Sequence, residues 1–469
     1  MTVFSLDQLP DVISKCGEYK DQSITFTPLS NVDLSSEHFT ITSDMSITFP
    51  SNRFSCKKIS ISNCKVVIRN LTMCGSIKVD NGELEIFDSV IENPDPSIDY
   101  ILAAQNNSTI IANNCTFSDS AHFGVSGDNH SFLAFDHCIF KNITLYGIEI
   151  TFFSALKCTN TTFQDLQADS IVVADQCTAK ISKCEFTGEQ KRAIYVRNAE
   201  YFVFDNSIVR NCKLSAFFIS NCEQFLMDTC HILNCGHTAT YLLQVLGVIK
   251  STTISNCNGN GINASHSRVL IKKCAFQQTT FPSIAICESA FGSIQKCEIS
   301  DSEMSGIIIR NDSQAAIEHT NIRNAKLFGI AISDSKEVSI KNSLIIQCQE
   351  AAVAVYNNSH IKIKSTNLIG PCKYGVDVFT GGSVNSQDTT IIGMSESAVW
   401  VHHAGYGLFQ KLIVSTNQIP PNADIAQIVS EFDFNNVKEN FDLQKVVKYE
   451  SRRPFTIYNS FVVDYGFFE

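Results

Sequence analysis

A pattern of about 23 residues, recurring from about residue 60 to residue 416, constrains this chain more than any other feature. Its most regular position is bulky and apolar, and after the first two steps its occurrences lie 22 or 23 residues apart. They are Val66, Ile91, Phe117, Phe140, Phe163, Phe186, Val209, Ile232, Ile254, Phe276, Ile299, Ile322, Ile345, Leu368, Ile391 and Ile413. A period of this length is typical of solenoids, in which each repeat covers the core of the next.

A second recurring position, two residues earlier, holds a small side chain. It is Cys64, Ser89, Cys115, Cys138, Thr161, Cys184, Ser207, Cys230, Thr252, Cys274, Cys297, Thr320, Ser343, Thr366 and Thr389, and Lys411 breaks the series. Residues two apart on a strand share a side, so both columns are expected to face inward from one strand. Many of the 19 cysteines occupy this column, and no zinc-type close spacing occurs. We therefore expect reduced, buried thiols that act as small apolar side chains.

A second strand is predicted to begin eight residues after the bulky position. Its inward residues are almost always an aliphatic pair, such as Ile148 with Ile150, Ile330 with Ile332 and Val376 with Val378. Short strands with turn residues between them, and no helical period, predict an all-β chain. Because parallel crossovers are right-handed, we predict a single-stranded right-handed parallel β-helix of about 16 coils.

The ends of the chain depart from the repeat, and open sheet edges need a cover. Residues 1–45 are predicted to form an amino-terminal cap, in which Leu6, Leu9, Val12 and Ile13 suit a short amphipathic helix. Residues 46–416 are assigned to the β-helix, and residues 417–469 to a carboxyl-terminal cap segment.

These columns resemble the parallel β-helix repeat of the pectin-lyase-like superfamily, within the right-handed β-helix domain family, over about 350 residues. The resemblance implies the fold but no single activity. Its polysaccharide lyases and galacturonan hydrolases would imply clustered aspartates with a basic residue. The nearest fragments, Gly127-Asp128-Asn129-His130 and Val79-Asp80-Asn81-Gly82, do not repeat their carboxylates on adjacent coils and are interpreted as loops.

Charge and the amino terminus restrict the partners. A formal net charge of −11 argues against nucleic acid or an anionic membrane surface. No window approaches the roughly 18 apolar residues of a membrane-spanning helix. The amino terminus lacks a secretory signal, so we expect an intracellular, cytoplasmic protein. We expect neither a cofactor nor a metal, since His402 and His403 have no identifiable third ligand.

One column of polar residues follows the second strand, and it places His266 and Glu288 on adjacent coils. This pair could act as a general acid and base. A ladder of polar turn residues explains the same column without catalysis, and we favour it.

The outward positions of the second strand hold the candidate binding residues. These are Tyr195, Arg197, Phe218 and Tyr241, and, nearer the carboxyl end, Tyr356, Asp377, Phe379, Trp400 and His402. Exposed aromatic side chains in a row could stack on sugar rings or contact a protein. Alternatively, a loop or the carboxyl-terminal segment covers them and they belong to the core.

The expected function is binding without catalysis: an elongated face that takes a protein or a glycan partner. The alternative is a polysaccharide-active lyase or glycoside hydrolase with a non-standard site, which would need paired carboxylates that the sequence does not clearly supply. A structural spacer without a ligand is the third possibility.

Overall fold

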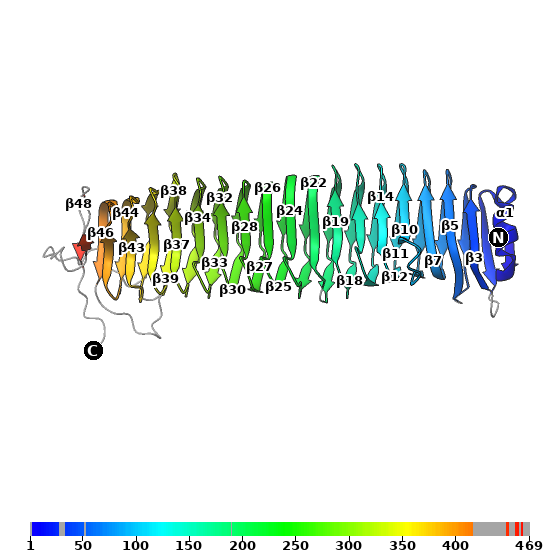
Figure 1. The fold of residues 1–469 in the computed structure, drawn as a ribbon, viewed down its shortest axis with the longest axis horizontal. Coiled ribbons are helices and arrows are strands. Elements are labelled where there is room, and N and C mark those ends of the chain that lie inside the picture. Colours follow the sequence, from blue (N-terminus) through cyan, green and yellow to red (C-terminus); the bar gives the residue numbers. More distant parts are fainter. Residues whose placement is uncertain are drawn as a thin grey trace. The chain divides into compact units, whose positions relative to one another are not determined.

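The computed structural model describes residues 2–27, 33–50, 53–188, 190–415, 447–449, 455–458 and 461–462. The chain forms two compact units, Met1–Gly236 and His237–Glu469. In each unit parallel strands follow one another in chain order (Figure 1). Together the units hold about 18 turns of a β-solenoid, close to the predicted number, so the predicted all-β parallel β-helix is confirmed.

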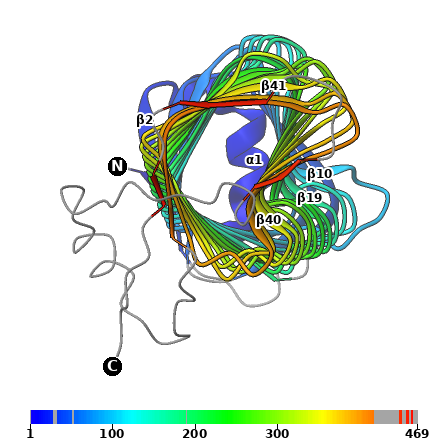
Figure 2. The same ribbon diagram turned by 90° about the vertical axis from the view of Figure 1, so that its left-hand side faces the viewer.

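The first unit begins with β1 (Thr2–Ser5), two short 3-10 turns, η1 (Leu6–Gln8) and η2 (Cys16–Tyr19), and the helix α1 (Leu9–Ser14) between them. Seen along the strand stack, α1 lies across the coil interior (Figure 2), and Leu9, Val12 and Ile13 are buried. The predicted amphipathic helix is therefore present. Parallel pairing of β1 with β2 and of β2 with β4 starts within residues 1–45.

Each regular coil holds three strands, which form three ladders numbered here in chain order within a coil. In the first unit the first ladder contains β1, β2 (Gln22–Thr27), β4 (Met45–Thr48), β6 (Lys65–Arg69), β8 (Glu83–Phe87), β11 (Thr109–Asn113), β14 (Phe132–Asp136), β17 (Ala155–Thr159) and β20 (Thr178–Ser182). The second contains β9 (Val90–Glu92), β12 (Thr116–Ser120), β15 (Ile139–Ile143), β18 (Thr162–Gln164), β21 (Glu185–Thr187), β23 (Ile208–Arg210) and β25 (His231–Cys235). The third contains β3 (Asp33–Ile41), β5 (Phe54–Ser62), β7 (Thr72–Asp80), β10 (Tyr100–Gln105), β13 (Phe123–Gly127), β16 (Ile148–Ile150), β19 (Asp169–Ala174), β22 (Arg192–Asp205) and β24 (Phe217–Asp228), of which β22 continues into the first ladder.

The second unit repeats this arrangement. Its third ladder runs through β26 (Thr240–Lys250), β28 (Ile262–Ser265), β31 (Ile284–Cys287), β34 (Ile307–Arg310), β37 (Phe328–Ser333), β40 (Ala351–Tyr356), β43 (Tyr374–Val378), β45 (Ser397–Val401) and β47 (Val447–Tyr449). Its first ladder continues from β26 through β29 (Arg268–Lys272), β32 (Phe291–Gln295), β35 (Gln314–Glu318), β38 (Val338–Lys341), β41 (His360–Lys364), β44 (Ser383–Ile392), β46 (Tyr406–Ser415) and β48 (Phe455–Tyr458). Its second contains β27 (Thr253–Cys257), β30 (Ala275–Thr279), β33 (Glu298–Ser300), β36 (Asn321–Arg323), β39 (Leu344–Ile346), β42 (Asn367–Ile369), and then parts of β44 and β46 with β49 (Phe461–Val462). Most of the predicted cap at 417–469 lies outside the described residues.

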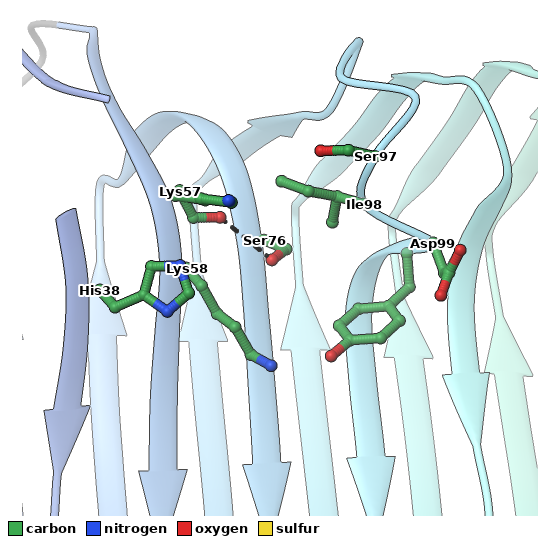
Figure 3. A pocket seen from close by; sticks show the side chains of 8 residues that line it. His38, Lys57, Lys58, Ser76, Ser97, Ile98 and Asp99 are labelled. Atoms are coloured by element: carbon green, nitrogen blue, oxygen red, sulfur yellow. Dashed lines mark hydrogen bonds between the residues drawn. The ribbon is translucent and has the colours of Figure 1, made fainter. Parts of the chain in front are cut away.

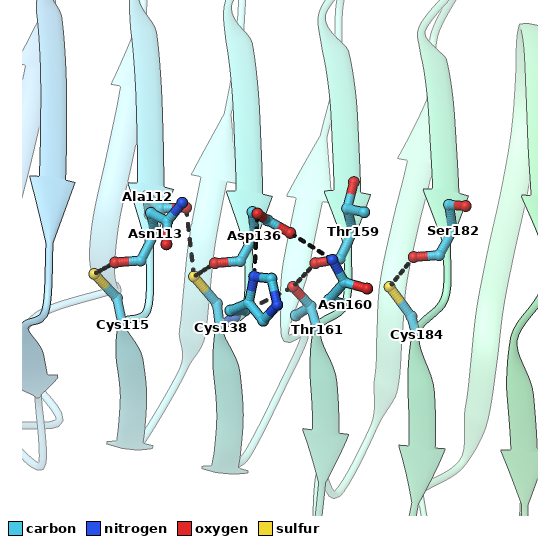
Figure 4. Close-up of polar contacts among 11 residues, drawn as sticks. Ala112, Asn113, Cys115, Asp136, Cys138, Thr159, Asn160, Thr161, Ser182 and Cys184 are labelled. Atoms are coloured by element: carbon cyan, nitrogen blue, oxygen red, sulfur yellow. Dashed lines mark hydrogen bonds and ion pairs between the residues drawn. The ribbon is translucent and has the colours of Figure 1, made fainter.

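A left-handed residue explains why there are three strands where the sequence predicted two. Asn160, with φ of 48°, separates β17 from β18, so the small and bulky columns do not continue the strand that precedes them. The next residue, Thr161, donates its hydroxyl to the carbonyl oxygen of Thr159 at 2.9 Å. Cys115, Cys138 and Cys184 make the same contact through their thiols at 3.2–3.4 Å (Figure 4). The small column thus supplies hydrogen-bond donors as well as small side chains.

The thiols in this column remain uncharged. All 19 cysteines are free, and only Cys74 is more than slightly exposed. Burial raises the pKa of Cys184 and of Cys230 to about 12. A protonated thiol can donate to a carbonyl where a thiolate could not.

The bulky column forms the centre of the core. Phe140, Phe163 and Phe186 are fully buried, and their rings stack at 5.0 and 4.6 Å between centroids. At both ends of the repeat the predicted column is wrong by a register shift. Ile91 pairs with Met73 and not with Val66, which belongs to the first ladder opposite Leu84.

At the carboxyl end, Val414 pairs with Ile391 and is buried. Ile413, the predicted core residue, pairs with Thr390 and is half-buried. The physical reason is that this last coil is 23 residues long in the structure, whereas the predicted alignment made it 22.

The turn after the second ladder carries the predicted amide ladder. Asn142 donates to Asp119, Asn234 to Asn211 and Asn324 to Asp301, each at 3.0 Å and across one coil. The residues sit at positive φ, which Asn and Asp tolerate better than other side chains. The prediction that Asn side chains hydrogen-bond along the solenoid is confirmed for these pairs.

The start of the third ladder requires small residues inside the coil. A Cβ added to Gly375 would lie 2.5 Å from Ile391 Cγ2 and 2.6 Å from the carbonyl oxygen of Ala398. Ala352 and Ala398 hold the equivalent place on the neighbouring coils and are buried. The residue before Gly375, Tyr374, contacts outward-facing Trp400, at a ring distance of 4.6 Å. Strict alternation is therefore lost where the third strand begins.

No helix among the described residues is long and apolar enough to cross a membrane.

Phe163→Ala should lower the free energy of unfolding by roughly 3–5 kcal/mol, because it opens a cavity between two stacked rings. Tyr201→Ala, at a ring that is 40% exposed in the same unit, serves as the control and should cost far less. Chemical denaturation measures both. Equal costs would mean that the bulky column does not form the core.

Candidate binding face

The outer side of the third ladder in the second unit carries one column of aligned residues across four coils. In register they are Ala331, Ala354, Asp377 and Trp400. Val376 and Val378, on either side of Asp377, are fully buried in the core, so Asp377 belongs to the opposite face of the strand. The column changes from small to large side chains where β43 and β45 meet, and there the candidate residues gather.

Asp377 and His402 form a buried pair on this face. The Oδ1 atom of Asp377 lies 3.0 Å from Nε2 of His402, and both residues are 7% exposed. Burial, with a smaller contribution from the charge of Glu350, raises the pKa of Asp377 to about 7. The carboxyl group therefore exchanges its proton near neutral pH.

The second nitrogen of His402 extends the contact. Its Nδ1 lies 2.6 Å from Nδ1 of His403. A proton must sit on one nitrogen of that pair, so two arrangements are self-consistent. Either His403 donates to His402 and His402 to the Asp377 carboxylate, or protonated Asp377 donates to His402 and His402 to His403. The three groups can thus hold or move a proton along one line.

Aromatic rings surround this pair. Tyr356, Phe379 and His402 form a continuous stack on three coils, with ring distances of 4.9 and 5.2 Å. The Trp400 ring lies parallel to His402 at 3.8 Å. Its Nε1 atom is buried and has no hydrogen-bond acceptor in the part of the chain that the structure describes. The sequence thus correctly grouped Tyr356, Phe379, Trp400 and His402 beside Asp377.

Charged residues border the rings. Lys373 contacts both carboxylate oxygens of Glu350 at 2.8 Å, and the Tyr374 hydroxyl donates to Glu396 at 2.6 Å. Burial, then this hydrogen bond, raises the pKa of Tyr374. The Lys448 ammonium, on β47, lies 4.7 Å from the Trp400 ring. Part of the carboxyl-terminal segment thus contacts the face, as one sequence alternative anticipated for these aromatic residues.

The first unit has its own aromatic group on the same ladder. Tyr195 and Phe218, both half-buried, are aligned on β22 and β24 and stack at 5.5 Å. Arg192 lies over the Tyr195 ring at 4.6 Å and forms two hydrogen bonds to the Asp169 carboxylate, at 2.9 and 3.0 Å. Arg197 is farther from its carboxylate, 3.9 Å from Asp175.

Tyr241 belongs to the second unit, where it is half-buried on β26 and pairs with Asn263. The structure therefore brings Tyr195 and Phe218 together in one unit and places Tyr241 in the other.

His266 and Glu288 occupy exposed turns after the third ladder, at φ of 48° and 52°. The His266 amide donates to the Glu288 carbonyl oxygen at 2.9 Å, and the Glu288 side chain accepts a hydrogen bond from Asn311 at 2.6 Å. Elsewhere in this column Asn221 donates to Asn198 at 3.0 Å. These contacts are those of a polar turn ladder, and they leave the side chain of Glu288 directed to Asn311.

Sequence reasoning missed Asp169, Arg192, Tyr374, Glu350 and Glu396. Asp169 and Arg192 lie 23 residues apart, so the repeat could have paired them. They were overlooked because alternation places them on the inward side, and that rule fails where the third strand begins.

No group of three or more His, Cys, Asp or Glu side chains that could hold a metal ion occurs within the described ranges.

Asp377→Asn tests the buried carboxyl group. Between pH 4 and 7 the folded protein retains a proton that the unfolded chain, with an ordinary pKa of 3.8, has lost. Its contribution to the free energy of unfolding therefore falls as the pH rises, by up to about 4 kcal/mol. Relative to wild type, the Asn variant should gain stability over this range in denaturation curves. A pH-independent difference would contradict the raised pKa.

Comparisons with known proteins agree with the architecture. Among solved structures, the chain is similar to a periplasmic alginate epimerase, AlgG, at 10% identity over 95% of this chain and 84% of the other, with a TM-score of 0.25. It is also similar to tailspike protein 3 of bacteriophage CBA120, at 8% identity over 98% and 61%, with a TM-score of 0.30. A third similar structure is that of the Vag8–C1 inhibitor complex, at 9% identity over 94% and 99%, with a TM-score of 0.37. A search of curated proteins found no match.

The sequence profile described as "Right handed beta helix region" matches residues 147–263 and 244–393. These overlapping matches together span residues 147–393, which is 247 of the 469 residues. With the parallel ladders of both units, the match shows that this chain belongs to the right-handed β-helix family.

Proposed function

We propose that this protein binds a glycan chain along the outer side of the third ladder and does not cleave it. The observation that carries the proposal is the recurrence of aromatic rings on consecutive coils of this face in each unit. They are Tyr195 with Phe218 in the first unit, and Tyr356 with Phe379 in the second. All four are half-buried, so each keeps part of its surface in contact with solvent.

The spacing and chemistry suit sugars. Coils are about 4.8 Å apart, which is close to the length of one sugar unit in an extended chain. The apolar face of a sugar ring packs on an aromatic ring, while its hydroxyl groups need polar partners. Arg192, Glu350 and Glu396 supply such partners beside the rings. Several weak contacts along one chain combine into useful affinity.

A glycan fits this face better than a protein partner does. Protein interfaces have a well-packed centre from which charged residues are depleted. Here carboxylates and cations alternate with the rings, as in the Lys373–Glu350 contact. A protein ligand remains an outcome that the binding experiment below distinguishes.

One observation favours a second candidate function, a polysaccharide lyase or hydrolase. Asp377 has a pKa of about 7 and contacts His402, which in turn contacts His403. A group that titrates near the working pH is suited to general acid–base catalysis. Against this candidate, Asp377 and His402 are both 7% exposed, which restricts the approach of a substrate.

Binding to a glycan array, followed by titration calorimetry with the best ligand, tests the leading proposal. Tyr195→Ala and Tyr356→Ala should each weaken binding between about twofold and tenfold, since each removes one stacking surface. Phe132→Ala and Phe291→Ala are matched controls, because these rings are 38% and 37% exposed but lie on the first ladder. They should leave the affinity unchanged. Absence of glycan binding, or equal losses in the controls, would refute the proposal, and selective capture of a protein would replace it.

Turnover separates the second candidate from the first. Wild-type protein and Asp377→Asn are incubated with the polysaccharides that bind, and new reducing or unsaturated ends are measured. The binding proposal predicts no new ends with either protein. Cleavage by wild type that Asp377→Asn abolishes would establish the enzyme instead.

A further inference from the structure

A hollow of about 180 Å³ lies near the start of the first unit (Figure 3). Its floor is formed by β3, β5 and β7 of the third ladder, which place His38, Lys58 and Ser76 side by side in register. Lys57, the residue before Lys58, also lines it. In Figure 3 both lysine side chains extend from β5 toward Ile98 and Asp99.

An irregularity in the strands brings two consecutive lysines to one hollow. The register of β5 against β7 shifts between Ser55 and Lys58, which interrupts the alternation of sides. On β7 the chain comes so close that a Cβ on Gly75 would lie 1.8 Å from the carbonyl oxygen of Cys56. Only glycine fits there, and its φ of 145° is one that other residues rarely adopt. The local geometry is therefore fixed by the sequence.

The opposite wall is a well-held loop between β9 and β10. The buried Asn93 amide donates to the carbonyl oxygens of Ile98 and Tyr100, both at 3.3 Å. From outside, His122 Nε2 lies 3.0 Å from the Pro96 carbonyl oxygen. A wall that is already ordered does not lose conformational entropy when a ligand binds.

The charge of the hollow is not neutralised. Among the described residues, the ammonium groups of Lys57 and Lys58 form no ion pair, and Asp99 is the one carboxylate that lines the hollow. Lysines on other coils are paired across neighbouring coils, as Lys65 is with Glu83 and Lys373 with Glu350. Two unpaired cations beside His38 therefore attract an anion.

We propose that this hollow binds a phosphate group, either free or as the monoester of a small molecule. Lysine binds phosphate as a point charge, and the Ser97 hydroxyl on the wall can donate to a third oxygen. A cavity of about 150 Å³ holds a benzene ring, so the hollow has room for phosphate and a few further atoms. Tyr100, whose ring lies 5.8 Å from the Lys58 ammonium, offers an apolar surface to the organic part.

Titration calorimetry at low ionic strength tests this site with inorganic phosphate, glucose 6-phosphate and glucose as probes. Wild type should bind at least one of the phosphates saturably and should not bind glucose. The double variant Lys57→Gln, Lys58→Gln should lose affinity by about tenfold or more, because it removes both charge-assisted contacts. Lys65→Gln, which removes the same type of charge from a paired lysine in this unit, should change the affinity by less than about twofold.

The results distinguish the two sources of phosphate. Tighter binding of glucose 6-phosphate than of inorganic phosphate indicates a monoester, and equal binding indicates the free anion. The proposal is wrong if neither phosphate binds saturably, if glucose binds equally well, or if Lys65→Gln causes the same loss. Circular dichroism of each variant confirms that the strands are retained. The site is independent of the glycan face, so failure of one proposal leaves the other intact.

Discussion

The structure depends on parallel register with a period of 22 or 23 residues, which places each side chain directly beside its equivalent on the next coil. A single coil of three short strands cannot enclose a core, so each one is stabilised only by its neighbours. The stacking of Phe140, Phe163 and Phe186 at 5.0 and 4.6 Å is the clearest expression of this constraint. The same register aligns the outer side chains, and this is why aromatic rings form continuous rows in each unit.

Turns with left-handed residues make the register possible. The chain changes direction at single residues with positive φ, such as Asn160 between the first and second ladders and Asp165 after the second. The small residue that follows Asn160 closes the turn by donating to a carbonyl oxygen, and cysteine, serine and threonine all share that capacity. Such a donor requirement explains a column of Cys, Ser and Thr better than size alone does.

Much of the fold could be predicted, because interior columns obey alternation and repeat at a constant spacing. The bulky residues from Ile91 to Ile391 were assigned correctly for this reason. Val66 and Ile413 were misassigned, since the coils at both ends have other lengths and fixed spacing then selects the wrong neighbour. The third strand per coil was missed because a single left-handed residue leaves little trace in hydrophobic periodicity.

The site was predictable only in part. Tyr356, Asp377, Phe379, Trp400 and His402 were grouped from their outward positions, which the register then brought together. The burial of Asp377 and its contact with His402 depend on side-chain packing across coils, which spacing does not encode. The basic hollow was invisible for another reason, since its wall and bulge lie where the repeat is least regular.

The central claim, that residues one coil apart are neighbours, can be tested on the unmodified protein. Zero-length carbodiimide coupling joins carboxylates to amines only when they are in contact, and mass spectrometry identifies the joined peptides. The account predicts links of Lys326 to Glu303 and of Lys373 to Glu350, each spanning 23 residues, and of Lys65 to Glu83. Links at unrelated spacings, without these three, would contradict the stacked register.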